Sequence, residues 1–304
     1  MDKVRRILVH VCKDQAAPQR AQFVQSVTGH FSDGGDDEVE VICSLERRQF
    51  VLQRGRGTPL KRPAFCPIKH LSVTEAAAIP LSVQQRGVDV GVAIILQTAN
   101  QRVLLTRRAK ELRIFPNVWV PPGGHVEPDE TLLEAGLREL KEETGLKLEP
   151  EGASPKVLGL WESVFPPMLS RGLPQRHHIV VYMLLLSPLS HLQHQASLRP
   201  FPAEVSACLW ADSQLVRAVV SSVDGEDGEV PLDHLQTTVS VSQVSSEGAL
   251  SDSSLSVEVL VGREPVIGPD VERVSTGTKF ALGLWLKSLE TSDLLTSCPL
   301  TSDL

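Results

Sequence analysis

One short stretch in the middle of the chain, residues 124–146, constrains its fold and chemistry most. Pro128 is typical of the start of a helix and Gly145 of its end. Between them, leucines recur at spacings of three and four residues, as they do on one apolar face of a helix. Three carboxylates share that spacing, so they are expected on one helical face. They are Glu139, Glu142 and Glu143.

Three carboxylates on one helical turn repel one another unless cations offset their charge. Arg138 lies four residues before Glu142 and neutralises only part of the cluster. Mg²⁺ and Mn²⁺ take oxygen ligands in octahedral geometry and leave positions for water or phosphate oxygens. The cluster beside a glycine-rich loop therefore suits a metal–diphosphate complex. A solvated acidic helix face is the alternative for the three glutamates taken alone.

The whole stretch resembles the signature of the Nudix hydrolases at every fixed position. Gly124 is followed after five residues by Glu130, then after seven by Arg138 and the glutamates, and finally by Gly145 and Leu146. The resemblance implies an α/β fold, namely the Nudix α/β/α sandwich with a mixed sheet. It also implies a metal-dependent hydrolase that cleaves the diphosphate linkage of a nucleoside diphosphate linked to another moiety.

The resemblance also implies roles for individual side chains. Glu139, Glu142 and Glu143 would bind Mg²⁺ or Mn²⁺, and Arg138 would hydrogen-bond within the signature and orient a glutamate. Glu204 stands before a strand, where many family members carry a further carboxylate, and would bind metal or activate water. These five residues are the predicted catalytic set.

Residues around the signature are candidates for contact with the substrate. Arg108 and Arg113 precede the catalytic loop and suit phosphate, or form a solvated basic stretch. Aromatic side chains could stack on a methylated guanine or lie in the core. Neighbouring histidines on a strand point to opposite faces, so His177 and His178 cannot chelate one ion together. The predicted substrate-binding residues are Arg108, Arg113, Trp119, Gly123, Gly124, Phe165 and His178, with Trp161 as a further aromatic candidate.

Specificity lies outside the signature, and several substrates stay open. The layout resembles that of one animal Nudix protein, in residues 161–163, 177–178 and 276–280 and in a short N-terminal unit, so hydrolysis of 5′-capped RNA is the leading hypothesis. Coenzyme A is an alternative, although Asn117 and Pro121 replace the glycine and phenylalanine of that pattern. NADH is a weaker alternative because the zinc ribbon is missing. A binding scaffold without catalysis is disfavoured by the complete glutamate set.

The pattern of apolar and polar segments predicts three parts. We expect a small α+β N-terminal unit over residues 1–86, with a helix over 15–27. A Nudix domain over 87–222 follows and begins with a hairpin over 88–106. Residues 223–304 are expected to form a linker rich in serine and acidic residues and then a C-terminal helix.

Composition limits the partners and the compartment. The net charge of −7 argues against extended DNA binding. Residues 1–113 nevertheless carry 18 Lys and Arg against 11 Asp and Glu, an excess that would suit a basic surface facing an anionic ligand. The five cysteines form no C-x-x-C pair, so reduced thiols in an intracellular, cytoplasmic setting fit best. No secretory signal is expected, and no apolar run approaches the ~20 residues of a membrane span.

Overall fold

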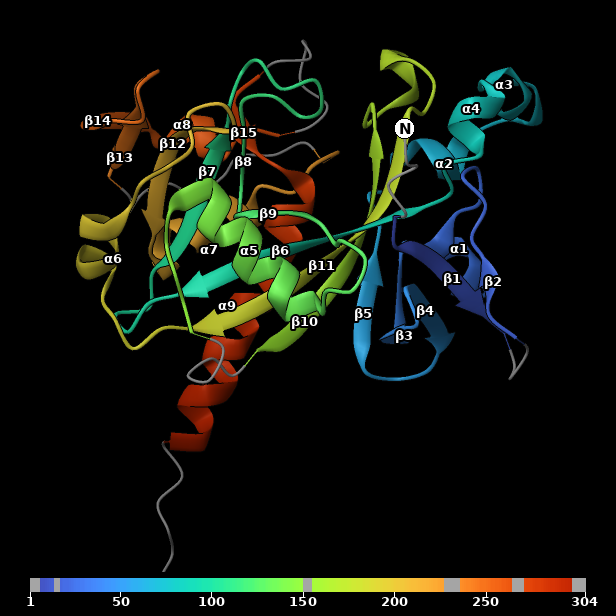
Figure 1. Ribbon diagram of the computed structural model, residues 1–304, viewed down its shortest axis with the longest axis horizontal. Coiled ribbons are helices and arrows are strands. Elements are labelled where there is room, and N and C mark those ends of the chain that lie inside the picture. The colour runs from blue at the N-terminus through green and yellow to red at the C-terminus, as the bar shows by residue number, and fades with distance from the viewer. Residues whose placement is uncertain (1–5, 14–16, 150–154, 227–235, 264–270, 297–304) are drawn as a thin grey trace, which may run out of the picture.

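A mixed β-sheet connects all fifteen strands of the computed structural model, which describes residues 6–13, 17–149, 155–226, 236–263 and 271–296 (Figure 1). The main path of the sheet runs β14-β13-β12-β7-β6-β11-β10-β5-β3-β4-β1-β2, with β9 beside β6, β8 beside β7 and β15 beside β8. The strands are β1 Leu8–Cys12, β2 Gln19–Arg20, β3 Glu38–Glu46, β4 Gln49–Arg54, β5 Thr58–Lys61, β6 Asp89–Gln97, β7 Val103–Arg108, β8 Val118–Val120, β9 Gly123–His125, β10 Lys156–Phe165, β11 Arg176–Leu186, β12 Val205–Ala211, β13 Thr238–Val244, β14 Leu250–Ser256 and β15 Arg273–Val274.

Helices cover both faces of this sheet. They are α1 Val27–Phe31, α2 Pro67–His70, α3 Val73–Ala78, α4 Leu81–Gln84, α5 Leu132–Thr144, α6 His191–Ser197, α7 Ser213–Ser221, α8 Val257–Leu260 and α9 Thr276–Thr296, with a 3-10 turn at Leu169–Arg171. Helix α5 packs on one face of the central strands, whereas α7 and α9 pack on the other (Figure 1). This arrangement is the expected α/β/α sandwich with a mixed sheet.

The central strand β6 changes partners along its length. Its whole length pairs in parallel with β11, from Asp89 opposite His178 to Gln97 opposite Leu186, but it meets β7 only where Gln97 lies opposite Val103. The two strands of the hairpin expected over residues 88–106 are therefore paired only next to its turn and separate from there on. Strand β9 lies beside the first half of β6, with His125 opposite Gly91. Because β6 and β7 diverge, space remains between them for a cleft.

Helix α5 is the helix expected from the signature. Thr131 and Glu134 form a capping box at its start, and Gly145 ends it with a φ of 75°, a left-handed conformation that glycine adopts without strain. Ala135 and Leu140 are fully buried against the sheet. The helix is therefore fixed at both ends and along one face, which holds its glutamates in place.

The N-terminal unit continues the same sheet and packs into the same core as α5. Strand β5 pairs with β10 through Leu60 and Leu160, and β1 meets β6 where Leu8 lies opposite Asp89. The helix expected over residues 15–27 is wrong for the part that the structure describes: β2 lies there, and α1 begins only at Val27. Pro18 excludes a continuous helix through this region, because proline has no backbone N–H and clashes with the preceding turn.

The serine-rich segment is not the expected linker in its described part. Strands β13 and β14 form an antiparallel hairpin, and β13 extends the sheet beside β12, with Ser242 opposite Cys208. In β13 polar residues alternate with valines, and Val241 is buried, as in a strand with one solvent-facing side. The expected C-terminal helix is present as α9, where buried Trp285 donates a hydrogen bond to Gln97 (2.7 Å).

Candidate active site

A cleft of about 530 Å³ opens where β6 and β7 diverge, and three distant parts of the chain line it. The central part is β9 with Glu139 and Glu143 of α5 and Glu204 from the turn before β12. The N-terminal unit contributes Arg6 and residues 63 and 65–67, and the C-terminal part contributes residues 273 and 275–277. The signature thus supplies only one wall of the cleft.

Glycines let β9 lie close to the catalytic helix. A Cβ at Gly124 would collide with the carboxyl group of Glu139, and one at Gly123 would collide with the backbone of β6 at Val92 and Ala93. Both predicted glycines line the cleft, and they bring the Glu139 carboxyl group against bare backbone. Such an arrangement lets a bulky phosphate approach the main chain closely.

Glu143 is the most buried of the predicted glutamates, with 6% of its surface exposed. The pKa of Glu143 is raised to about 8: burial is the largest cause, the charge of Arg108 opposes it, and the charges of Glu139 and Glu204 add to it. The backbone N–H of Gly123 donates a hydrogen bond to this carboxyl group. Its Oε2 atom has no hydrogen-bond partner among the described residues. A buried carboxyl oxygen without a partner is expected to meet a ligand, and a hard cation is one that fits.

Arg138 holds the signature together as expected. Its guanidinium group donates to Glu130 (2.7 Å), to Glu139 (2.8 Å) and to the backbone carbonyl of His125 (3.0 Å). Burial raises the pKa of Glu139, and the hydrogen bond from Arg138 offsets part of that effect. Arg138 therefore links α5, the loop before it and β9.

Glu142 lies apart from the other two glutamates. Its side chain is 57% exposed, it does not line the cleft, and Arg138 bonds it at 3.1 Å. The helical spacing does place Glu142 beside Arg138, and this ion pair between residues four apart holds its carboxylate outside. Within the described ranges, no three His, Cys, Asp or Glu side chains converge closely enough to hold a metal ion. The role of Glu142 as a metal ligand stays a prediction.

Arg108 is the predicted arginine that reaches the cleft. Its guanidinium group donates to the carbonyls of Ile114 (3.0 Å) and Phe115 (3.1 Å), which fixes its orientation. Burial lowers the pKa of Arg108, while the charges of Glu143 and Glu204 oppose that shift. A fixed cation next to acidic groups suits the binding of a phosphate held between them.

Aromatic residues line another part of the cleft. Trp161 and Tyr182 both contribute to the lining, and a Cβ at Gly277 would approach the Tyr182 hydroxyl to 2.7 Å and the Trp161 ring to 2.8 Å. The backbone of the first turn of α9 therefore packs closely against these two rings. Phe65 and Phe115 come from the two loops that complete the lining. A surface of this kind suits a planar base.

Three predicted substrate-binding residues lie outside the cleft lining, which corrects their assignment. Trp119 is fully buried, and its indole N–H donates to Glu272 (2.9 Å). Arg113 is exposed on the loop after β7, and Phe165 packs edge-on against Phe115 at 5.1 Å. Trp119 belongs to a core strand, whose inward side chains are enclosed by α9 and β15, a burial that local sequence does not reveal.

The two neighbouring histidines diverge as the strand geometry predicts. His178 lines the cleft, where burial and neighbouring cationic groups lower its pKa to about 3, so its ring is neutral. His177 points the other way, where its ring contacts the carbonyl oxygen of Phe23 (2.7 Å) and Oε1 of Glu162 (3.1 Å). His178 thus faces the cleft, whereas His177 contacts the N-terminal unit.

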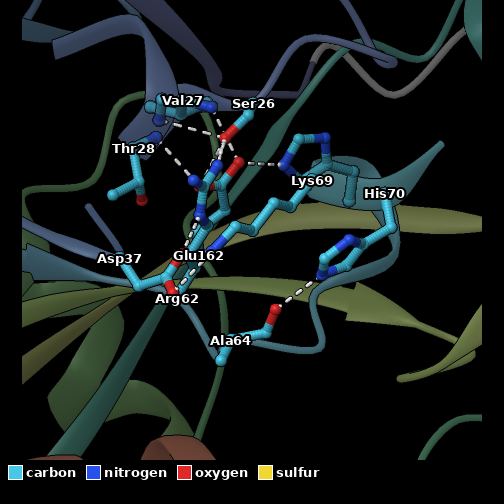
Figure 2. A network of polar contacts seen from close by, with 11 residues as sticks. Ser26, Val27, Thr28, Asp37, Arg62, Ala64, Lys69, His70 and Glu162 are labelled. Atoms are coloured by element: carbon cyan, nitrogen blue, oxygen red, sulfur yellow. Dashed lines mark hydrogen bonds and ion pairs between the residues drawn. The ribbon is translucent and has the colours of Figure 1, made fainter. Parts of the chain in front are cut away.

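A buried polar network fixes the N-terminal unit against the cleft (Figure 2). The carboxylate of Glu162 on β10 accepts hydrogen bonds from the backbone N–H groups of Val27 (2.7 Å) and Thr28 (2.9 Å). Arg62 contacts Ser26 and pairs with Asp37 at 2.8 Å. The cleft residues 63 and 65–67 follow Arg62 directly, so this network sets the position of that wall.

Sequence reasoning missed several of the lining residues outside the signature. Arg6, Phe65, Asp89 and Arg176 come from segments with no local motif, and only long-range strand pairing brings them to β9. Trp161 was a candidate platform, and the cleft includes it. Two sequence features indicated Trp161: it lies in a predicted strand near the signature, and the chain has few aromatic residues.

The chain is similar to known proteins over nearly its whole length. The family model described as "NUDIX domain" matches residues 86–224. The chain is 62% identical to the m7GpppN-mRNA hydrolase NUDT17 of Danio rerio, over 95% of this chain and 98% of that protein. The NUDT17 proteins of Xenopus laevis and Homo sapiens are 48% and 45% identical, over 96% and 90% of this chain and 98% and 85% of theirs. These relatives carry the name that abbreviates nucleoside diphosphate-linked moiety X motif 17, the animal protein that the layout resembles, so the predicted resemblance is confirmed.

Proposed function

Because this chain belongs to the Nudix hydrolase family, we propose that it removes the 5′ cap of messenger RNA by hydrolysing the phosphoric anhydride linkage between methylguanosine and the RNA chain. Its relatives named m7GpppN-mRNA hydrolase support this substrate. One structural observation carries the proposal: Glu143, whose Oε2 atom has no hydrogen-bond partner among the described residues, lines the same cleft as the aromatic side chains of Trp161 and Tyr182. Anhydride chemistry and base recognition thereby share one cleft.

The acidic part of the cleft fits a divalent cation. Nudix hydrolases generally use divalent metal ions, and Mg²⁺ or Mn²⁺ prefers the carboxylate oxygens found here. Glu139 and Glu143 would hold the ion, with Glu142 joining them if its carboxylate leaves Arg138. Once bound, the cation supplies positive charge that polarises the diphosphate and lowers the pKa of an attacking water.

Side chains of this chain would position the remaining groups. Arg108 would hydrogen-bond a phosphate oxygen, since its orientation is fixed and it borders Glu143 and Glu204. Glu204 would accept a proton from the attacking water at its carboxylate, because it lines the cleft near enough to Glu139 and Glu143 for its charge to raise their pKa values. Arg138 would keep Glu139 aligned through its bond to that carboxylate.

The aromatic part of the cleft would bind the methylated guanine. A methylguanine ring carries positive charge, and stacking on Trp161 or Tyr182 would stabilise such a ring. Burial raises the pKa of Tyr182, so its hydroxyl stays neutral, and a hydrogen bond with the side chain of Thr278 opposes part of that shift. Gly277 lets the first turn of α9 pack against the two rings, so only the small part of each ring that α9 leaves uncovered lines the cleft.

The test is a side-by-side assay of candidate substrates with Mg²⁺ or Mn²⁺. Methylguanosine-capped RNA, coenzyme A, NADH, ADP-ribose and dinucleoside polyphosphates would be offered at equal concentration, with products separated by chromatography. We expect the highest kcat/KM for capped RNA, with release of a methylguanosine phosphate. A higher kcat/KM for coenzyme A or NADH would contradict the proposal.

A messenger RNA substrate suits an intracellular, cytoplasmic protein. No disulfide joins the cysteines among the described residues, which are Cys12, Cys43, Cys66 and Cys208. None of the helices in the described part of the chain is long and apolar enough to span a membrane.

A further inference from the structure

One part of the cleft is basic, and neither the signature nor the proposed chemistry uses it. Arg6 and Arg176 line the cleft. Arg86 lies beside them: it donates to the carbonyl of Gln175 (3.4 Å), and its charge lowers the pKa of Arg176 after the larger effect of burial. Arg6 also acts on Arg176 in this way. We call Arg6, Arg86 and Arg176 the basic rim.

The positive charge of the basic rim is only partly balanced. Arg6 pairs with Asp89 at 2.9 Å. In the parts of the chain that the structure describes, no ion pair joins Arg86 or Arg176 to a carboxylate. Three guanidinium groups thus face one acid, and repulsion between them would fall if an anion bound among them.

Asp89 provides a second observation at the same place. It is 4% exposed and lines the cleft, and its Oδ1 atom has no hydrogen-bond partner among the described residues. Its other oxygen accepts the bond from Arg6. A buried acceptor of this kind is expected to meet a donor on a ligand. A ribose hydroxyl would supply that donor next to phosphates held by the rim.

Strand β9 connects the basic rim to the glutamates. Gly123 at its start donates to Glu143, and His125 at its end is close enough to Asp89, Arg6 and Arg176 for their charges to affect its pKa. Two residues along a strand span about 7 Å. A chain of phosphates that begins at the glutamates could therefore reach the rim without leaving the cleft.

We propose that the basic rim binds the sugar–phosphate backbone of the RNA chain that continues from the cap. This inference rests on the proposed function and deepens it: the enzyme recognises a capped chain rather than the cap alone. Arg86 and Arg176 contact the phosphates, and Arg6 does so while it keeps its pair with Asp89. Affinity for long substrates then depends on salt, because each arginine that neutralises a phosphate releases a counterion.

The test compares a cap dinucleotide with a capped 20-nucleotide RNA. The variant carries Arg86→Gln and Arg176→Gln and leaves the Arg6–Asp89 pair intact. The ratio of KM for the long substrate to KM for the short one should rise about tenfold. The slope of log KM against log salt for the long substrate should fall by roughly 1.4, since single strands contribute about 0.7 per contact. Arg217→Gln, an exposed arginine on α7, is the matched control and should change neither value.

Two further measurements separate this inference from the proposed function. Arg86→Lys with Arg176→Lys keeps the charge and should restore most of the salt slope. Fluorescence anisotropy with an uncapped 20-nucleotide RNA measures RNA binding by the basic rim without catalysis. It therefore tests this inference even if no capped substrate is cleaved. Weaker RNA binding by the Gln variant than by Arg217→Gln supports the rim. Equal RNA binding by the two, or an equal change in KM for short and long substrates, overturns it.

Discussion

At the scale of single residues, the proposed chemistry of the cleft depends on the buried carboxyl group of Glu143. It has few favourable partners: the backbone N–H of Gly123 bonds it, Arg108 lies nearby, and Oε2 has none among the described residues. Two other acids, Glu139 and Glu204, surround it. Such a group is unfavourable as an isolated anion and becomes favourable once a cation binds.

Replacing Glu143 with glutamine should remove most of the activity and keep the fold. The amide has nearly the same shape, but it is a much weaker ligand for a hard cation. We expect kcat on capped RNA to fall by roughly 100-fold or more, as loss of metal-site residues does. Steady-state kinetics measure this, with Glu111→Gln as an exposed control that keeps full activity. Full activity in Glu143→Gln would rule out the role.

The raised pKa of Glu143 predicts a pH dependence of stability in metal-free protein. In the folded state its pKa is about 8, whereas its ordinary value is 4.5. Between these values the folded protein holds more protons than the unfolded protein, so the free energy of unfolding falls as pH rises. The Tm measured with a chelator should therefore drop from pH about 5 to about 8, and more steeply than in Glu143→Gln. Parallel curves for the two proteins would contradict the burial of this carboxyl group.

The positions of the predicted catalytic residues in the fold could largely be inferred from the sequence, because they depend on local spacing; their roles stay a prediction. Helical periodicity alone places Glu139 and Glu143 on the face that meets β9. The same periodicity could not show that Arg138 holds Glu142 outside the cleft, since that depends on competition between carboxylates for one guanidinium group. Arg6 and Asp89 were out of reach of sequence reasoning, because β1 and β6 meet only in the folded chain.

At the scale of elements, the cleft depends on segments that hold its walls in register. Helix α5 presents the glutamates, α9 packs against the aromatic side chains, and the network at Glu162 positions the wall at residues 63 and 65–67. Although burial raises the pKa of Glu162, its bonds to His177 and to the backbone of Thr28 outweigh that effect and leave the pKa low. Glu162 therefore acts as a buried anion that ties α1 to β10 and β11.

Changing Glu162 to glutamine should loosen the N-terminal unit. An amide cannot accept both backbone N–H bonds and the bond from His177, so at least one buried donor loses its partner. We expect a loss of about 1–3 kcal/mol in the free energy of unfolding, measured in urea. Amide hydrogen exchange at Val27 and Thr28 should also become faster. Glu111→Gln serves as the control, and unchanged exchange at both amides would contradict this role of Glu162.

Helices and strands could be predicted where their apolar residues follow a regular period, and less well where that period is interrupted or masked by polar residues. The α5 helix and the β6 strand follow directly from periodicity and apolar content. The β13–β14 hairpin was missed because its many serines suggest a linker, although they alternate with valines along β13. The expected helix over residues 15–27 failed because one proline outweighs the apolar spacing around it.

At the scale of the whole molecule, the N-terminal unit is part of the catalytic fold. Its strands continue the sheet through β5 and β10, and β1 closes back on β6 at Asp89. It also supplies Arg6 and Phe65 to the cleft. The predicted division at residue 86 separates segments in sequence but cuts through paired strands and one hydrophobic core.

A fragment of residues 87–304 should therefore fail to fold on its own. Removing β1–β5 would expose the edge of β10 and the buried side chains of Glu162 and His177. We expect an insoluble or loosely packed product, judged by sedimentation and by near-ultraviolet circular dichroism. A soluble fragment that cleaves a cap dinucleotide with the kcat of the full chain would show instead that the unit is dispensable.

Cation binding by the glutamates of the cleft underlies the proposed activity, and a titration with Mn²⁺ followed by electron paramagnetic resonance measures it. The full chain should take up at least one Mn²⁺, and Glu143→Gln should bind it at least about tenfold more weakly. Absence of Mn²⁺ uptake by the unaltered protein, or equal uptake by the variant, would contradict a metal site at these carboxylates.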